Sequence, residues 1–112
     1  MAGEIAGGGL AAAVALTARD EGGAALVGQM LIYPMLDDRT VSRDAELERV
    51  ALWTYDDYVT AWTAYLGPDP VESPYATPLR ADDLRGLPAN YFEVGEVDIF
   101  RAENLDYVHR QL

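Results

Sequence analysis

The chain has 112 residues, of which 50% are hydrophobic, and a formal net charge of −11 at pH 7. This composition predicts one folded globular domain rather than a disordered chain. The strong acidity excludes nucleic acid and anionic lipid as partners, and the absence of cysteine excludes a disulfide framework and a thiolate metal site.

The start of the chain carries no targeting signal that we recognise. It lacks the positive region of a signal peptide, and the apolar stretch 10–16 is too short to span a bilayer. We therefore expect no membrane span and a cytoplasmic location.

The first residues, Gly3-Glu4-Ile5-Ala6-Gly7, have the outline of a nucleophile elbow. Its pattern, G-x-S-x-G, places a serine on a sharp turn between a strand and a helix, with glycines where side chains would collide with the sheet and the helix. Ile5 occupies the serine position. Its alkyl side chain has no lone pair with which to attack a carbonyl carbon.

A buried helix and a buried strand are predicted next. Residues 8–20 are rich in alanine and apolar on nearly all sides, which predicts a fully buried helix that ends at the glycines 22–23. Residues 26–33 form an apolar run without polar alternation, as in parallel sheets covered on both faces. Pro34 ends this strand because it cannot donate to a sheet ladder.

A polar loop over 37–44 and a short helix over 45–52 follow. A second helix begins near Thr54, with Asp57 as its capping partner, and runs to residue 66, where Gly67-Pro68 stops it. Four aromatic side chains lie along this helix at helical spacing: Tyr55, Tyr58, Trp62 and Tyr65. We expect this aromatic stripe to pack against the core, with contact to a ligand as the alternative.

The last third of the chain is predicted to contain a loop over 68–88, a strand over 90–94 and a closing helix over 102–112. Asp98 precedes this helix, where its carboxylate could cap free backbone N–H groups. The order of elements predicts an α/β fold in which two parallel strands, 26–33 and 90–94, have flanking helices.

Several further segments accompany the elbow in a fixed order: 8–16, 28–37, 73–78 (SPYATP), 84–88 (LRGLP) and 94–103 (VGEVDIFRAE). Together they resemble the α/β-hydrolase esterases of the hormone-sensitive-lipase type. The resemblance covers nearly the whole chain but only the middle-to-late part of such an enzyme. It implies one incomplete α/β-hydrolase domain over residues 1–112.

The resemblance also implies roles for individual residues. Asp98 would be the triad acid that orients a histidine, and Ala6 would donate one oxyanion-hole N–H. Gly3 and Gly7 would be the elbow glycines, and Ile5 stands in place of the nucleophile. In the family, the rest of the oxyanion hole lies before the matched part and the catalytic histidine lies after it. Helix capping stays the alternative role for Asp98.

No other residue is expected to replace the missing catalytic groups. The two serines, Ser42 and Ser73, lie in a predicted loop and a predicted turn. The single histidine, His109, is eleven residues from Asp98, which along one helix is about 16 Å. We expect His109 to be a surface residue of the closing helix.

We therefore expect a fragment of a carboxylic-ester hydrolase that is inactive by itself, without cofactor or metal. Its parent would hydrolyse small acyl esters through an acyl-enzyme, and Ile5 together with the missing parts suggests a decayed gene or one with misplaced boundaries. The alternative is a non-catalytic binding or assembly module. We expect the elbow strand to be lost, leaving a bare sheet edge beside residues 26–33 that favours self-association.

Two further alternatives have weaker support. Residues 7–12 fit the dinucleotide fingerprint G-x-G-x-x-A, but the fingerprint requires a strand immediately before it. Glu93, Glu96 and Asp98 could bind a metal ion, but they lack an ordered ligand spacing.

Overall fold

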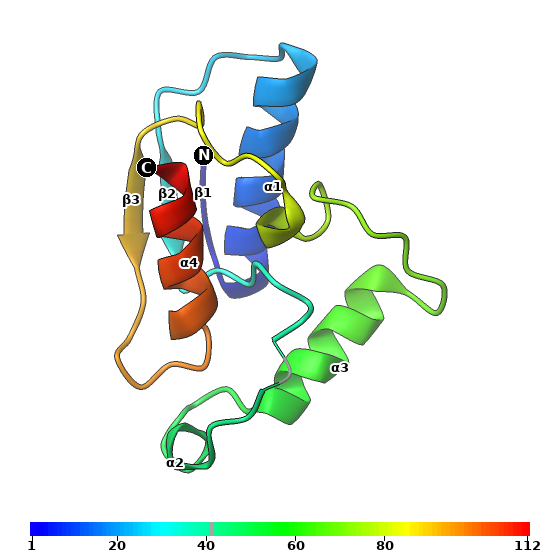
Figure 1. Ribbon diagram of the computed structural model, residues 1–112, viewed down its shortest axis with the longest axis vertical. Coiled ribbons are helices and arrows are strands. Elements are labelled where there is room, and N and C mark those ends of the chain that lie inside the picture. The colour runs from blue at the N-terminus through cyan, green and yellow to red at the C-terminus, as the bar shows by residue number, and fades with distance from the viewer. Residues whose placement is uncertain (41) are drawn as a thin grey trace.

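The computed structural model describes residues 1–40 and 42–112; Val41, within the predicted loop 37–44, lies outside this description. Its centre is a parallel sheet with the strand order β1-β2-β3, in which Ala2 is paired with Met30 and Met30 with Tyr91 (Figure 1). The strands are β1 (Ala2–Glu4), β2 (Gln29–Ile32) and β3 (Asn90–Glu93). The two expected strands are confirmed with shorter bounds, and β1 is an additional strand.

The presence of β1 makes the expectation of a bare edge beside β2 wrong. Three residues at the start of the chain are enough to pair in parallel with β2. β2 is shorter than expected because its ladders begin only at Gln29 and Met30, and because the backbone turns at Tyr33, where φ is 35°. Within the described residues, the unpaired edges are the outer sides of β1 and β3.

The helices largely follow the local signals in the sequence. They are α1 (Ile5–Glu21), α2 (Ala45–Glu48), α3 (Tyr55–Leu66) and α4 (Arg101–Gln111), with a 3-10 turn η1 at Pro78–Arg80. α1 ends at Gly22, whose φ of 65° is left-handed and favours glycine. α3 begins with the expected capping box between Thr54 and Asp57. No helix in 1–40 or 42–112 has the length and apolar character needed to cross a membrane.

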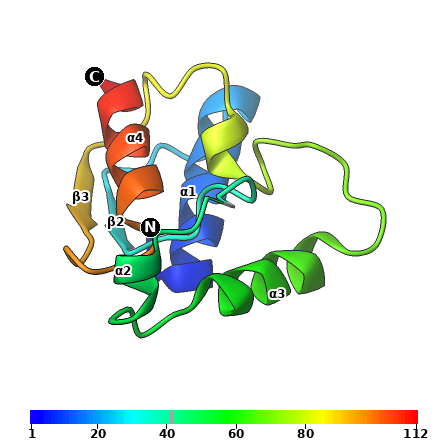
Figure 2. The same cartoon turned by 60° about the horizontal axis from the view of Figure 1, so that its bottom comes forward.

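α1 and α4 lie on one face of the sheet, and α2 and α3 lie beyond one of its ends (Figures 1 and 2). Gln29 and Leu31 of β2 point toward this face and are buried. Met30 and Tyr91 point to the other face and are 49% and 54% exposed. The expected cover on both faces is therefore wrong for the described residues.

Two hydrophobic clusters form the core. The first joins α1, the sheet and α4 through residues such as Leu16, Leu31 and Tyr107. The second includes Tyr58 and Trp62, which confirms the packing interpretation for most of the aromatic stripe, although Tyr65 is 51% exposed. α1 is less buried than expected, because its apolar residues include two large exposed ones, Leu10 and Val14.

Candidate active-site region

The turn from β1 into α1 has the sharp geometry of an elbow. β1 ends at Glu4 and α1 begins at the next residue, Ile5, with no loop between them. Ile5 has a φ of 47°, a left-handed conformation that is strained for a β-branched residue. The backbone shape that would present a nucleophile is therefore present, with an alkyl side chain on it.

Close backbone packing surrounds this turn. A Cβ atom at Gly3 would lie 2.2 Å from the carbonyl oxygen of Gly7, and one at Gly9 would lie 2.3 Å from that of Met35. At Gly8 it would lie 2.8 Å from Cβ of Pro34. At Gly7 no described atom lies within 4 Å, so the expected steric need for glycine holds at Gly3 and is wrong at Gly7. The close packing at Gly8 and Gly9 was not predicted from the sequence, although the run of three glycines at 7–9 was a signal for it.

Asp98 lies in the turn between β3 and α4. Its carboxylate Oδ1 accepts the N–H of Phe100 at 2.9 Å, and its own N–H donates to the carbonyl of Gly95. α4 begins only at Arg101, so Asp98 holds the turn before the helix rather than capping an N–H of its first turn. Partial burial raises the pKa of Asp98, and the hydrogen bond from Phe100 opposes this shift.

One groove of about 330 Å³ brings the nucleophile position and the acid position together. Its lining consists of Ile5, Tyr33, Val50, Leu52, Trp53, Gly95, Val97, Asp98 and Phe100. Parallel strands place their carboxyl ends at the same end of a sheet, which explains how Ile5 and Asp98 come to line one groove. We call this cavity the Asp98 groove. Tyr33 and Trp53, which also line it, were not predicted from the sequence to belong to a site.

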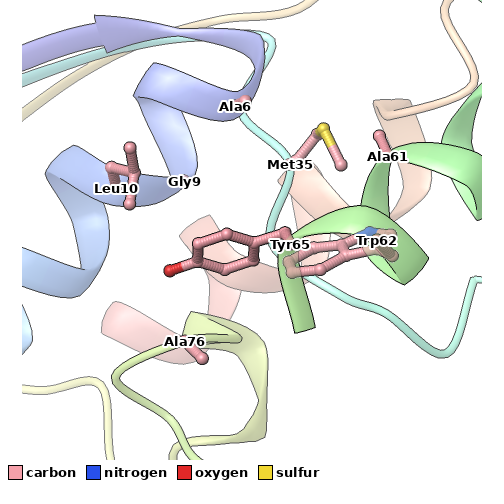
Figure 3. Close-up of a pocket in the computed structure, with 8 residues that line it drawn as sticks. All are labelled: Ala6, Gly9, Leu10, Met35, Ala61, Trp62, Tyr65 and Ala76. Atoms are coloured by element: carbon pink, nitrogen blue, oxygen red, sulfur yellow. The ribbon is translucent and has the colours of Figure 1, made fainter. Parts of the chain in front are cut away.

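Ala6 lies beside a second, smaller cavity of about 80 Å³ between α1 and α3 (Figure 3). As the second residue of α1, Ala6 belongs to the first turn, whose N–H groups have no partner within the helix. Tyr65 points toward Leu10 across this cavity, and Trp62 also lines it (Figure 3). The ligand-contact alternative for the aromatic stripe therefore stays open for these two residues.

The remaining candidates lie elsewhere. His109 is exposed near the end of α4, as expected, and it lines neither cavity. Ser73 accepts the backbone N–H of Tyr75 in a turn, and Ser42 is exposed. No cluster of three or more potential metal ligands occurs within 1–40 and 42–112. A strand does precede the 7–12 fingerprint, contrary to expectation, but these glycines are part of α1 rather than a loop.

A parallel sheet whose first strand leads through a strained turn directly into a helix, with a carboxylate in the turn after β3, is the arrangement of an α/β-hydrolase segment. The chain belongs to the alpha/beta hydrolase fold family, which matches residues 1–112. The chain is 34% identical over 110 residues to Esterase LipI of Mycobacterium tuberculosis (strain ATCC 25618 / H37Rv).

Solved structures give the same result. Bacterial Heroin Esterase matches with 39% identity and a TM-score of 0.81, and esterase LipW from Mycobacterium marinum matches with 37% identity and a TM-score of 0.87. Each structural match covers 97% of this chain but only 37% and 34% of the two relatives, respectively. The match to Esterase LipI covers 96% of this chain and 34% of that protein. The chain thus spans about a third of the length of its relatives.

Proposed function

We propose that the chain is the segment of a carboxylic-ester hydrolase that carries the nucleophile turn and the triad acid, and that it is inactive because Ile5 replaces the nucleophile. The observation that carries the proposal is the Asp98 groove, which Ile5 and Asp98 line together. Ile5 has the left-handed backbone of an elbow, and Asp98 is fixed by the N–H of Phe100. The relatives with the word esterase in their names support the reaction class.

In the parent reaction, a hydroxyl at position 5 would attack the carbonyl carbon of a small acyl ester, and a histidine would remove its proton. Asp98 would orient that histidine, and the N–H of Ala6 would donate to the oxyanion of the tetrahedral intermediate. Gly3 lets the turn close onto α1. The 112-residue chain supplies the acid and one donor but neither an oxygen at position 5 nor a histidine near Asp98.

A direct test measures hydrolysis of p-nitrophenyl acetate by the chain and by its Ile5→Ser variant. We expect no turnover above buffer for either, since a serine without a general base loses several orders of magnitude in rate. A fluorophosphonate probe read by mass spectrometry should likewise leave the unmodified chain unlabelled. Turnover or a covalent adduct on the unmodified chain would contradict its proposed inactivity.

A chimera tests the roles of the individual residues. Residues 1–112 replace the matching third of Esterase LipI, with either Ile5 or a serine at that position. We expect activity only with Ile5→Ser, and loss of that activity on adding Asp98→Asn. Circular dichroism of each chimera serves as the folding control. An active chimera that retains Ile5, or one that keeps full activity with Asp98→Asn, would refute the proposed roles.

The second candidate function is a non-catalytic assembly module, with self-association as its simplest form. The uncovered sheet face with Met30 and Tyr91, and the unpaired outer edges of β1 and β3, favour it. The net charge of −11 opposes contact between two copies, so added salt should strengthen association. Sedimentation at several concentrations and salt levels tests this, and a monomer under all conditions would contradict it.

We also propose a cytoplasmic location for the chain.

A further inference from the structure

The four residues after β2, which we call the exit segment (33–36), lie against the start of α1. The carbonyl of Ile5 accepts the N–H of Met35 at 3.0 Å. Gly8 and Gly9, which follow the elbow, allow this segment to approach the helix closely. A strained backbone conformation persists only where its surroundings hold it, and here the exit segment holds the left-handed turn at position 5.

Two consecutive residues of α4 hold the exit segment in turn. The amide nitrogen Nδ2 of Asn104 donates to the carbonyl of Pro34 at 2.8 Å, and Glu103 accepts the N–H of Leu36 at 2.9 Å. Between Pro34 and Leu36 lies Met35, the residue whose N–H donates to the elbow. All five residues are buried. α4 therefore fixes the main chain on each side of the group that contacts the elbow.

Asn104 is an unusual residue for the interior. Its side chain is 0% exposed, yet among the described residues its Oδ1 atom has no hydrogen-bond partner. A buried amide that is satisfied at only one end costs stability, and an apolar side chain would avoid this cost. Stability alone therefore does not account for Asn104, whereas its bond to the Pro34 carbonyl gives it a role in placing the exit segment.

We propose that Asn104 is a positioning residue for the nucleophile turn, because it fixes the main chain at position 5 through Pro34 and Met35. Without this donor the Pro34 carbonyl can move, and the Met35 N–H no longer holds the Ile5 carbonyl in the left-handed turn. The side chain at position 5 and the N–H of Ala6 then lose their fixed orientation together. The catalytic meaning of this role rests on the proposed function, but the contacts themselves can be measured without ester turnover.

The first measurement is residue-resolved hydrogen exchange by NMR on the 112-residue chain and its Asn104→Leu variant. Leucine has the branching of asparagine without its donor. In the unmodified chain, we expect the Met35 N–H to be protected as strongly as that of Leu16, which is buried in α1. In Asn104→Leu, protection at Met35 should fall at least about tenfold more than at Leu16. A purely structural loss of stability would lower both equally.

The second measurement reads position 5 directly. The chain contains no cysteine, so Ile5→Cys introduces a single thiol, whose thiolate fraction follows from its alkylation rate at several pH values. The N–H groups at the start of α1 stabilise a thiolate that is held in the elbow orientation. Adding Asn104→Leu should lower the thiolate fraction at pH 7 at least about threefold, because the sulfur then moves away from these groups.

Tyr107→Phe is the matched control for both measurements. It removes a buried hydroxyl from the same helix, and this hydroxyl does not bond to the exit segment. We expect protection at Met35 relative to Leu16, and the thiolate fraction of Ile5→Cys, to be unchanged by it. Neither measurement requires ester turnover, so a failure of this inference is distinguishable from a failure of the proposed esterase role.

Three outcomes would overturn the proposal. They are rapid exchange of the Met35 N–H in the unmodified chain, equal losses of protection at Met35 and Leu16 in Asn104→Leu, or a thiolate fraction that does not respond to this change. The first outcome needs no variant. Where Asn104→Leu does not fold, the smaller Asn104→Ala removes the same donor, and the same two comparisons decide the question.

Discussion

Tyr58 of α3 and Glu103 of α4 are hydrogen-bonded to each other in the interior, with exposures of 1% and 4%. Glu103 also accepts the N–H of Leu36 at 2.9 Å and the hydroxyl of Thr40 at 2.7 Å. One carboxyl group therefore joins α4 to α3 and to the segment that follows β2.

The protonation of Glu103 follows from this geometry. The Tyr58 hydroxyl has one proton but lies within hydrogen-bond distance of two acceptors, Glu103 and the carbonyl of Asp37. In its protonated form Glu103 donates to Tyr58, which then donates to the carbonyl of Asp37; in its ionised form Glu103 accepts the Tyr58 proton instead. Burial raises the pKa of Glu103 to about 7, against the hydrogen bonds from Tyr58, Leu36 and Thr40 that lower it.

This buried acid should make the stability of the chain depend on pH. Because its pKa is higher in the folded state than its ordinary value of 4.5, its contribution to stability is complete below pH 4.5 and is lost as the pH rises through about 7. We expect the unfolding free energy to fall by about 3 kcal/mol over this range. In Glu103→Gln most of this dependence should disappear, as measured by urea unfolding at several pH values.

The exposed face of the same helix offers a control for that measurement. Asp106→Asn removes one negative charge from α4 without touching the interior, and it should retain the pH dependence. The raised pKa of Asp98 acts in the same direction. The unfolding free energy of Glu103→Gln should therefore still fall with rising pH, but less steeply than that of the unmodified chain. If the unfolding free energy of Glu103→Gln depended on pH as strongly as that of the unmodified chain, Glu103 would not be the titrating group.

The elbow glycines should respond in opposite ways to alanine. Gly3→Ala places Cβ 2.2 Å from a backbone oxygen, which requires the turn to shift and should cost about 3 kcal/mol. Gly7→Ala meets no described atom within 4 Å and lies in a helix, so it should stabilise the chain by about 0.5 to 1 kcal/mol. Thermal unfolding of both variants checks this, and similar melting temperatures would contradict it.

The capping box at the start of α3 should contribute measurably to the unfolding free energy. The Thr54 side chain accepts the N–H of Asp57 at 3.1 Å, and Asp57 accepts the N–H of Thr54 at 3.0 Å. Thr54→Ala removes the first of these bonds and should cost about 1 kcal/mol of unfolding free energy. Thr60→Ala, on the exposed surface of the same helix, should be neutral or slightly stabilising. Equal effects of the two changes would exclude a capping contribution.

Arg110 should stabilise the position of α4 against the η1 segment. Its guanidinium donates to the carbonyl of Leu79 at 2.7 Å and also to that of Ala81. Arg110→Met retains most of the apolar side chain but leaves both carbonyls without this donor, at a cost of about 2 kcal/mol in chemical unfolding. Arg101→Met changes an exposed arginine of the same helix and should cost less than about 0.5 kcal/mol. Comparable losses would contradict the assigned contact.

Local signals in the sequence were sufficient for much of the fold. The Thr54 and Asp57 box, the stop at Gly67 and the glycine end of α1 are all present, because each depends on residues within one helical turn. β1 was not predicted, since three residues containing glycine carry no strand pattern and are ordered only by pairing with β2.

The candidate site was predictable only in part, for a related reason. Ile5 and Asp98 were selected through motif resemblance, and the structure places both in one groove. Trp53 was missed because it reaches the groove from the segment before α3, far from both in sequence. Glu103 was missed because an acidic residue on an amphipathic helix is ordinarily exposed, and only its tertiary partners reveal why it is buried.

The left-handed backbone at position 5 exists without any reacting oxygen, so tight glycine packing rather than chemistry determines it. Some isoleucine codons differ from serine codons by a single base. One point mutation would then place a hydroxyl in the orientation that the main chain already prescribes, so the backbone at this position would need no rearrangement to present an oxygen.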